Sequence, residues 1–88
     1  MTKLNYKKSL IKKLLYRSIY SGSKELDFVL SSFAKNNLEE LSISELESYE
    51  KFLTLGDVNI WNWISNNESL PFFEDENYEK FILMMKNS

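Results

Sequence analysis

The feature that most constrains the fold is a glycine between two apolar runs with helical spacing. Gly22 is one of only two glycines in the 88 residues, and Ser23 follows it directly. Glycine is common just past a helix C-terminus, where φ becomes positive, and serine is a favoured N-cap of the next helix. So short a corner makes the two helices antiparallel neighbours. The chain is therefore predicted to begin with a helical hairpin.

The two helices of this hairpin are amphipathic. Leucine and isoleucine recur from Leu10 to Ile19 with lysines between them, which predicts about three turns ending near Tyr20. The second helix is predicted to end at 35–37, where asparagine favours a stop. The apolar pattern starts after residues 1–6, and we expect these six residues to be loose.

Three further helices are predicted beyond the hairpin. Ser42 lies three residues before Glu45, which is the spacing of a capping box at a helix N-terminus, and Gly56 is expected to stop that helix. Asp57 is expected to be the N-cap of a short fourth helix. A final helix is predicted over about 74–86. Because no run alternates as a strand would, the fold class is all-α, a compact five-helix bundle.

Length and charge limit the organisation of the chain. Residues 1–88 suffice for one hydrophobic core and are expected to form a single domain. Residues 1–24 carry seven basic side chains and no acidic one, whereas the remaining residues carry four basic and thirteen acidic side chains. The basic first helix can pair with this acidic body or attract an acidic partner. The alternative interpretation is that these lysines form a solvent-exposed helix face without a binding role.

Two missing residue types exclude most catalytic chemistry. The chain has no cysteine and no histidine, so thiol nucleophiles, thiolate or imidazole zinc sites and histidine-based acid–base schemes are excluded. The neighbouring carboxylates at 39–40 and 75–76 lack the apolar setting of a catalytic acid and are interpreted as surface charge. We expect no catalytic residue, no metal site and no bound cofactor, and hence no enzyme.

The fourth helix carries two tryptophans. Trp61 is expected to belong to the core and Trp63 to be partly exposed, rather than both serving as platforms for base stacking. No apolar run approaches the length of a membrane-spanning helix. The basic, serine-containing amino terminus has features of a transit peptide, but 10–19 is needed as core, so we expect it to stay in the mature domain.

Two blocks of the sequence resemble the succinate dehydrogenase assembly factors, which promote covalent flavinylation of that enzyme. The corner at 21–27, with 14–18 before it, is similar to the family's Arg-Gly-x-x-Glu motif. The block at 56–64 is similar to the family's acidic residues followed by an aromatic, one residue, a tryptophan and an aliphatic. Between them, 42–55 is similar to the family's third helix. The resemblance thus covers about residues 10–65.

One position departs from the family pattern. Where the family carries arginine before the glycine, this chain has Ser21, which cannot pair bidentately with a carboxylate. Arg17 lies four residues earlier on the same helix face, and Lys24 lies just beyond the turn, so either can supply a positive charge. Glu25 on its own is a carboxylate that favours a helix N-terminus. The resemblance places a partner-binding surface at Arg17, Ser21, Gly22, Lys24 and Glu25.

The resemblance implies an assembly factor, a chaperone without catalytic residues, that binds the flavoprotein subunit of succinate dehydrogenase and promotes covalent attachment of FAD to it. FAD is then carried by the client protein, and the related fumarate reductase subunit is a further candidate client. We expect a monomer in the cytoplasm, or in the mitochondrial matrix of a eukaryote, with neither nucleic acid nor stable membrane insertion. The alternative is a basic-helix module that binds nucleic acid or a membrane surface, or an antitoxin-like regulator.

Overall fold

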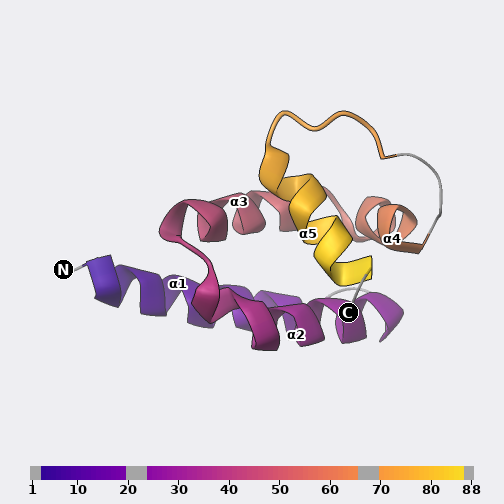
Figure 1. The fold of residues 1–88 in the computed structure, drawn as a ribbon. Coiled ribbons are helices and arrows are strands. Elements are labelled where there is room, and N and C mark those ends of the chain that lie inside the picture. Colours follow the sequence, from indigo (N-terminus) through magenta and orange to yellow (C-terminus); the bar gives the residue numbers. More distant parts are fainter. Residues whose placement is uncertain (1–2, 20–23, 66–69, 87–88) are drawn as a thin grey trace.

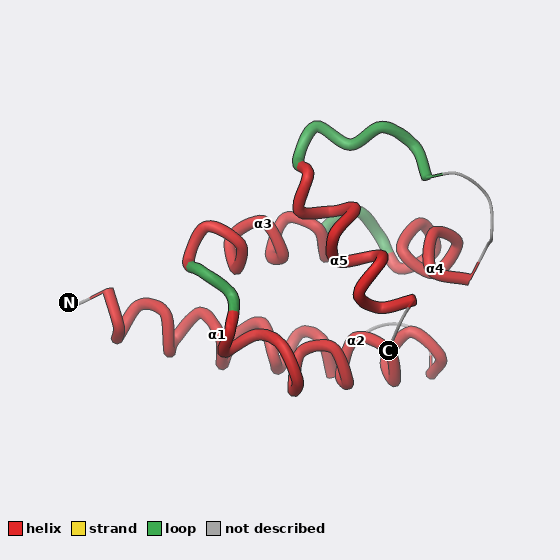
Figure 2. The backbone as a smooth tube through the Cα atoms, in the orientation of Figure 1, coloured by secondary structure: helices red, strands yellow, loops and turns green. Residues whose placement is uncertain are grey.

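The computed structural model describes residues 3–19, 24–65 and 70–86. Every regular element in these ranges is helical (Figure 1, Figure 2). In chain order they are α1 (Lys3–Ile19), α2 (Lys24–Asn37), the 3₁₀ helix η1 (Leu38–Glu40), α3 (Ile43–Leu53), α4 (Asp57–Ser65) and α5 (Glu76–Lys86). The predicted all-α class and five-helix bundle are confirmed for the described residues.

The helices form two layers. α1 and α2 pack along each other as the predicted hairpin, while α3 packs on α1 and α5 packs on α2 (Figure 1). α4 lies at one end of the second layer against α5. The corner between α1 and α2, with Tyr20, lies outside the described residues.

Aromatic rings fill the space between the two layers. The ring centroid of Tyr49 on α3 lies 5.3 Å from that of Phe33 on α2 and 5.5 Å from that of Phe81 on α5. Phe52, one turn further along α3, lies 5.8 Å from Phe81. All four side chains are buried. Burying one large side chain contributes about 2–3 kcal/mol, so this cluster is a main source of attraction between the layers.

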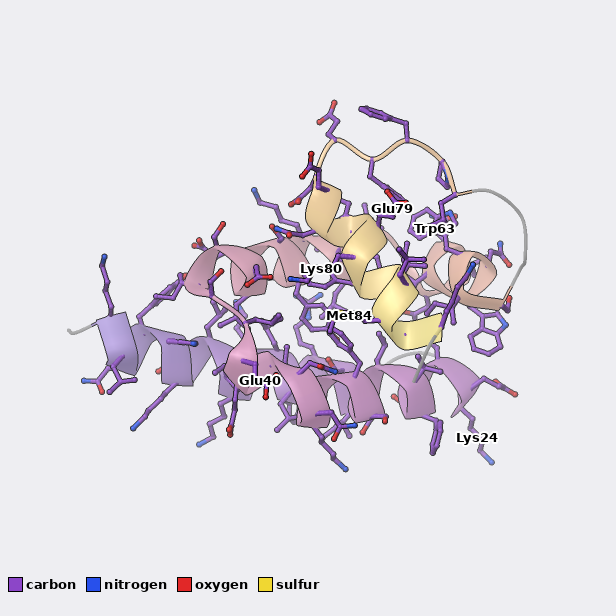
Figure 3. All side chains as sticks on the ribbon, in the orientation of Figure 1. Lys24, Glu40, Trp63, Glu79, Lys80 and Met84 are labelled. Carbon is purple, nitrogen blue, oxygen red and sulfur yellow. The ribbon has the colours of Figure 1, made fainter. Side chains whose placement is uncertain are left out.

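The capping box predicted at the start of α3 is confirmed. The backbone N–H of Glu45 donates to Ser42 Oγ at 3.1 Å, and the N–H of Ser42 donates to Glu45 Oε1 at 3.0 Å. The second carboxylate oxygen of Glu45 accepts from the Lys80 ammonium, which reaches across from α5 (Figure 3). The Lys80 bond, followed by the Ser42 backbone bond, lowers the pKa of Glu45 to about 2. One carboxylate thus caps α3 and joins it to α5.

Glu45→Ala is expected to destabilise the fold by about 1 kcal/mol, and Glu45→Gln by less, because glutamine keeps an acceptor for the Ser42 N–H. Since the pKa of Glu45 is lowered from 4.5, its ionic contribution is present above about pH 4.5 and is lost as the pH falls towards 2. Urea unfolding at neutral pH and near pH 3 measures both effects. Equal losses of stability in the alanine and glutamine variants would contradict the role of Glu45 as both the cap of α3 and the link to α5.

Several helix boundaries differ from the predictions. α1 begins at Lys3, so residues 3–6, which we expected to be loose, are helical; the Tyr6 hydroxyl donates to Glu47 on α3 at 3.1 Å. Asp57 is the first residue of α4 rather than its cap. α5 begins two residues later than predicted, after Asp75, whose side chain accepts from a backbone N–H at 2.9 Å.

The prediction for the two tryptophans of α4 is confirmed for Trp63, which is partly exposed, and is wrong for Trp61. Ile60 is the fully buried residue of this helix, and both indoles are half-buried. Trp63 packs edge-on against Phe73 of the loop before α5, with ring centroids 5.0 Å apart, and also contacts Phe52 at 6.5 Å (Figure 3). Trp61, which was predicted to belong to the core, is therefore only half-buried. The contact of Trp63 with Phe73 lies outside α4, so helical periodicity does not reveal it.

Candidate functional site

The candidate site is the end of the hairpin where α1 meets α2. Of its five predicted residues, Arg17, Lys24 and Glu25 are described, and all three are exposed. Ser21 and Gly22 lie outside the described residues. Arg17 occupies the last turn of α1, and the other two open α2. Lys24 is the first residue of α2 and points away from the bundle (Figure 3).

The charges at this end suit the helices that carry them. Arg17 lies at the negative end of α1, and Glu25 lies at the positive end of α2. Neither residue, nor Lys24, forms an ion pair with another described residue. The described ends of α1 and α2 therefore present both signs of charge to solvent, where a partner with matching charges can pair with them.

Exposed aromatic side chains flank these charges. Tyr16 on α1 is 65% exposed and Phe28 on α2 is 77% exposed. Phe28 lies four residues after Lys24 and three after Glu25, so the three share one face of α2. Aromatic residues are enriched where proteins bind each other. We call Tyr16, Arg17, Lys24, Glu25 and Phe28 the corner surface.

Beneath the corner surface, two consecutive buried hydrogen bonds anchor the end of α1 to α3. Ser18 is fully buried, and its hydroxyl donates to the carbonyl of Leu14 at 2.8 Å. Ser18 Oγ also lies 2.6 Å from the hydroxyl of Tyr49. Because the one proton of Ser18 goes to Leu14, the Tyr49 hydroxyl donates to Ser18. Burial raises the pKa of Tyr49 to about 12, against smaller lowering effects of Ser18 and Arg17.

Sequence reasoning missed both Ser18 and Phe28. Ser18 continues the core stripe of Leu10 and Leu14 at intervals of four, so a serine at this position was a signal of a buried hydrogen bond. Phe28 departs from the apolar stripe that contains Leu26 and Leu30, and a large aromatic off that stripe was a signal of an exposed contact residue.

The structure adds two negative findings for the described residues. No group of three or more acidic side chains there is arranged to hold a metal ion. None of the described helices is long and apolar enough to cross a membrane.

A family model described as the flavinator of succinate dehydrogenase matches residues 12–87. The chain belongs to this family. The family resemblance inferred from the two sequence blocks is thus confirmed, and both blocks lie inside the matched range.

Individual relatives of this flavinator family carry one name, succinate dehydrogenase assembly factor 2, mitochondrial. The relative from Dictyostelium discoideum is 38% identical over 74 residues, which are 84% of this chain and 50% of the relative. The relative from Meyerozyma guilliermondii is 36% identical over 73 residues, which are 83% of this chain and 54% of the relative. The chain therefore spans about half the length of these relatives. No solved structure matches it.

Proposed function

We propose that this chain is an assembly factor that binds the flavoprotein subunit of succinate dehydrogenase and promotes covalent attachment of FAD to that subunit. The observation that carries the proposal is the match of residues 12–87 to the flavinator family, and the names of the relatives support succinate dehydrogenase as the enzyme that is assembled. We place its action where the client is assembled, in the mitochondrial matrix of a eukaryote or the cytoplasm of a bacterium.

The factor acts by binding and supplies no reacting group. The chain has no histidine or cysteine, so the groups that form the flavin bond belong to the client. A binding protein promotes a reaction when it binds one conformation of its client more tightly than the others. Moving a client from about 1% to about 99% in the competent conformation takes about a 10⁴-fold difference in affinity. A tight, specific interface can supply such a difference.

The corner surface is the proposed contact. Its two cationic side chains and its carboxylate pair with opposite charges on the client, while Tyr16 and Phe28 supply apolar area that is exposed in the free chain. The Ser18–Tyr49 bond holds the end of α1 in place before binding, which lowers the cost of ordering the interface.

Ser21→Arg is expected to raise client affinity only slightly in the wild-type chain, because Arg17 already provides a guanidinium at the same end of the hairpin. In the Arg17→Ala background the same substitution is expected to recover most of an approximately tenfold loss, since the two charges then substitute for each other. Calorimetric titration of the purified flavoprotein subunit with the wild-type chain, the two single variants and the double variant measures this coupling. Equal gains in both backgrounds would contradict substitution by Arg17.

The binding experiment itself titrates the wild-type chain into the apo-flavoprotein subunit and, separately, into the subunit that already carries covalent FAD. The proposal expects tighter binding to the apo form. A chain that binds neither form, or that binds only the flavinylated form, would contradict it.

A further inference from the structure

The two sides of α1 make different contacts with the rest of the bundle. One flank is fixed to α3, where the Tyr6 hydroxyl donates to Glu47 at 3.1 Å and the Lys13 ammonium pairs with Glu50 at 2.5 Å. Positions 6 and 13 are seven apart and therefore share a face. Residues two positions away from them lie on roughly the opposite side of the helix, because each step turns by about 100°.

On its opposite side, α1 lines a groove together with Glu39 of η1, and the volume of this groove is about 580 Å³. Aliphatic side chains of α1 line its floor, namely Leu4, Ile11 and Leu15. Leu4 is 60% exposed, while the other two are half-buried against the core. From Leu4 to Leu15 the helix rises about 16 Å, or three turns. The apolar floor thus has the length of a short helix.

Lysines surround this floor. Lys7, Lys8 and Lys12 line the groove, and Glu39 of η1 is the one acidic side chain among the described residues that line it. Among the described residues none of these lysines has an ion-pair partner, in contrast to Lys13 on the other flank. A strip of three turns with aliphatic side chains at its centre and unpaired ammonium groups beside it therefore faces solvent.

We propose that this groove binds an acidic amphipathic helix of a partner protein. The complementary segment has about three turns, aliphatic side chains along one stripe and glutamate or aspartate beside that stripe. Its apolar stripe covers Leu4, Ile11 and Leu15, and its carboxylates pair with Lys8 and Lys12. This is helix-in-groove recognition, in which apolar anchors at helical spacing supply affinity and flanking charges fix orientation.

The chemistry of the groove favours a helix over other anionic partners. Proteins that bind single-stranded nucleic acid stack its bases on aromatic rings, and none of the described residues that line this groove is aromatic. A helix that lies on an anionic membrane usually carries tryptophan or phenylalanine on its apolar face, whereas the floor here is aliphatic. A concave floor also fits a single helix better than a flat lipid surface.

The groove is a second surface, independent of the proposed flavinylation function. Most of its lining lies before residue 12, where the family match begins. The test of this groove therefore does not depend on whether the corner surface binds the flavoprotein.

A fluorescent, stapled three-turn peptide with leucines along one stripe and glutamates beside it is the probe. A second peptide of the same composition with its leucines scattered around the helix is the control. Anisotropy is expected to show at least about tenfold tighter binding of the striped peptide. Lys8→Glu/Lys12→Glu is expected to abolish this preference, and Leu4→Ser to weaken binding about threefold. The matched control Lys35→Glu/Lys51→Glu changes net charge equally at exposed lysines elsewhere and should bind within about twofold of wild type.

Equal affinity for the two peptides would overturn the proposal, as would equal losses in the two double variants. Two further measurements on the same variants detect other occupants. Binding to vesicles of phosphatidylcholine and phosphatidylglycerol without binding to the striped peptide would assign the groove to a lipid surface. Self-association that depends on Lys8 and Lys12, without peptide binding, would assign it to a second copy of the chain. Either result overturns the proposal.

Discussion

Glu25→Ala is expected to weaken binding to the flavoprotein subunit by about tenfold or more, with little change in fold stability. Glu25 is exposed and forms no ion pair with another described residue, so its removal leaves no buried group without a partner. Its helix N-terminal position accounts for about 0.3–1 kcal/mol of stability at most. Calorimetric titration of the subunit and a thermal melt of each variant measure the two quantities.

Glu76→Ala is the matched control for this substitution. Glu76 also opens a helix, α5, and is also exposed, so its removal costs the same kind of helix-terminal stabilisation. It lies on a different helix from the corner surface and should leave client binding unchanged. If the two variants bind the client equally well, the corner surface is not the contact.

Ser18→Ala is expected to destabilise the fold by about 1–3 kcal/mol, because it leaves the buried Tyr49 hydroxyl without an acceptor. Tyr49→Phe is expected to cost less, since Ser18 still donates to Leu14 at 2.8 Å. The double variant is expected to be more stable than Ser18→Ala alone, because both polar partners are then gone. Urea unfolding of the four proteins measures this cycle, and simple additivity would contradict the hydrogen-bond chain.

The same buried hydroxyl predicts an alkaline loss of stability. The folded pKa of Tyr49 is raised from 10.0 to about 12, chiefly by burial. Its contribution is therefore complete below pH 10 and is lost as the pH rises towards 12, by up to about 3 kcal/mol. Tyr49→Phe should lose stability less steeply over this range than wild type. Parallel pH profiles would show that Tyr49 does not stay protonated in the fold.

Local signals in the sequence predicted the helices and several of their ends. Ser42 and Glu45 form a capping box through neighbouring atoms, so spacing alone specifies it. The first turns of α1 are joined instead to α3 by a hydrogen bond between Tyr6 and Glu47, which are 41 positions apart. The partial burial of Trp63 likewise involves Phe73 of the loop before α5, and periodicity within α4 does not contain that information.

The charged residues of the candidate site could be predicted from the sequence, whereas the buried hydrogen bond that holds the end of α1 in place could not. Arg17, Lys24 and Glu25 were placed at one end of the hairpin from the predicted corner and the family resemblance, and the structure brings them to the ends of α1 and α2. The anchoring role of Ser18 requires Tyr49, which lies 31 positions later. A pairing between distant helices follows from tertiary packing, and one sequence does not reveal it.

The covalent FAD content of the flavoprotein subunit, produced with and without this chain, tests the central claim most directly. Fluorescence of the denatured subunit in a gel reads only the covalently attached flavin. The account predicts a clear rise with the wild-type chain and with Glu76→Ala, and a content with Glu25→Ala close to that without any chain. A flavin content that is the same with and without the wild-type chain would contradict the account.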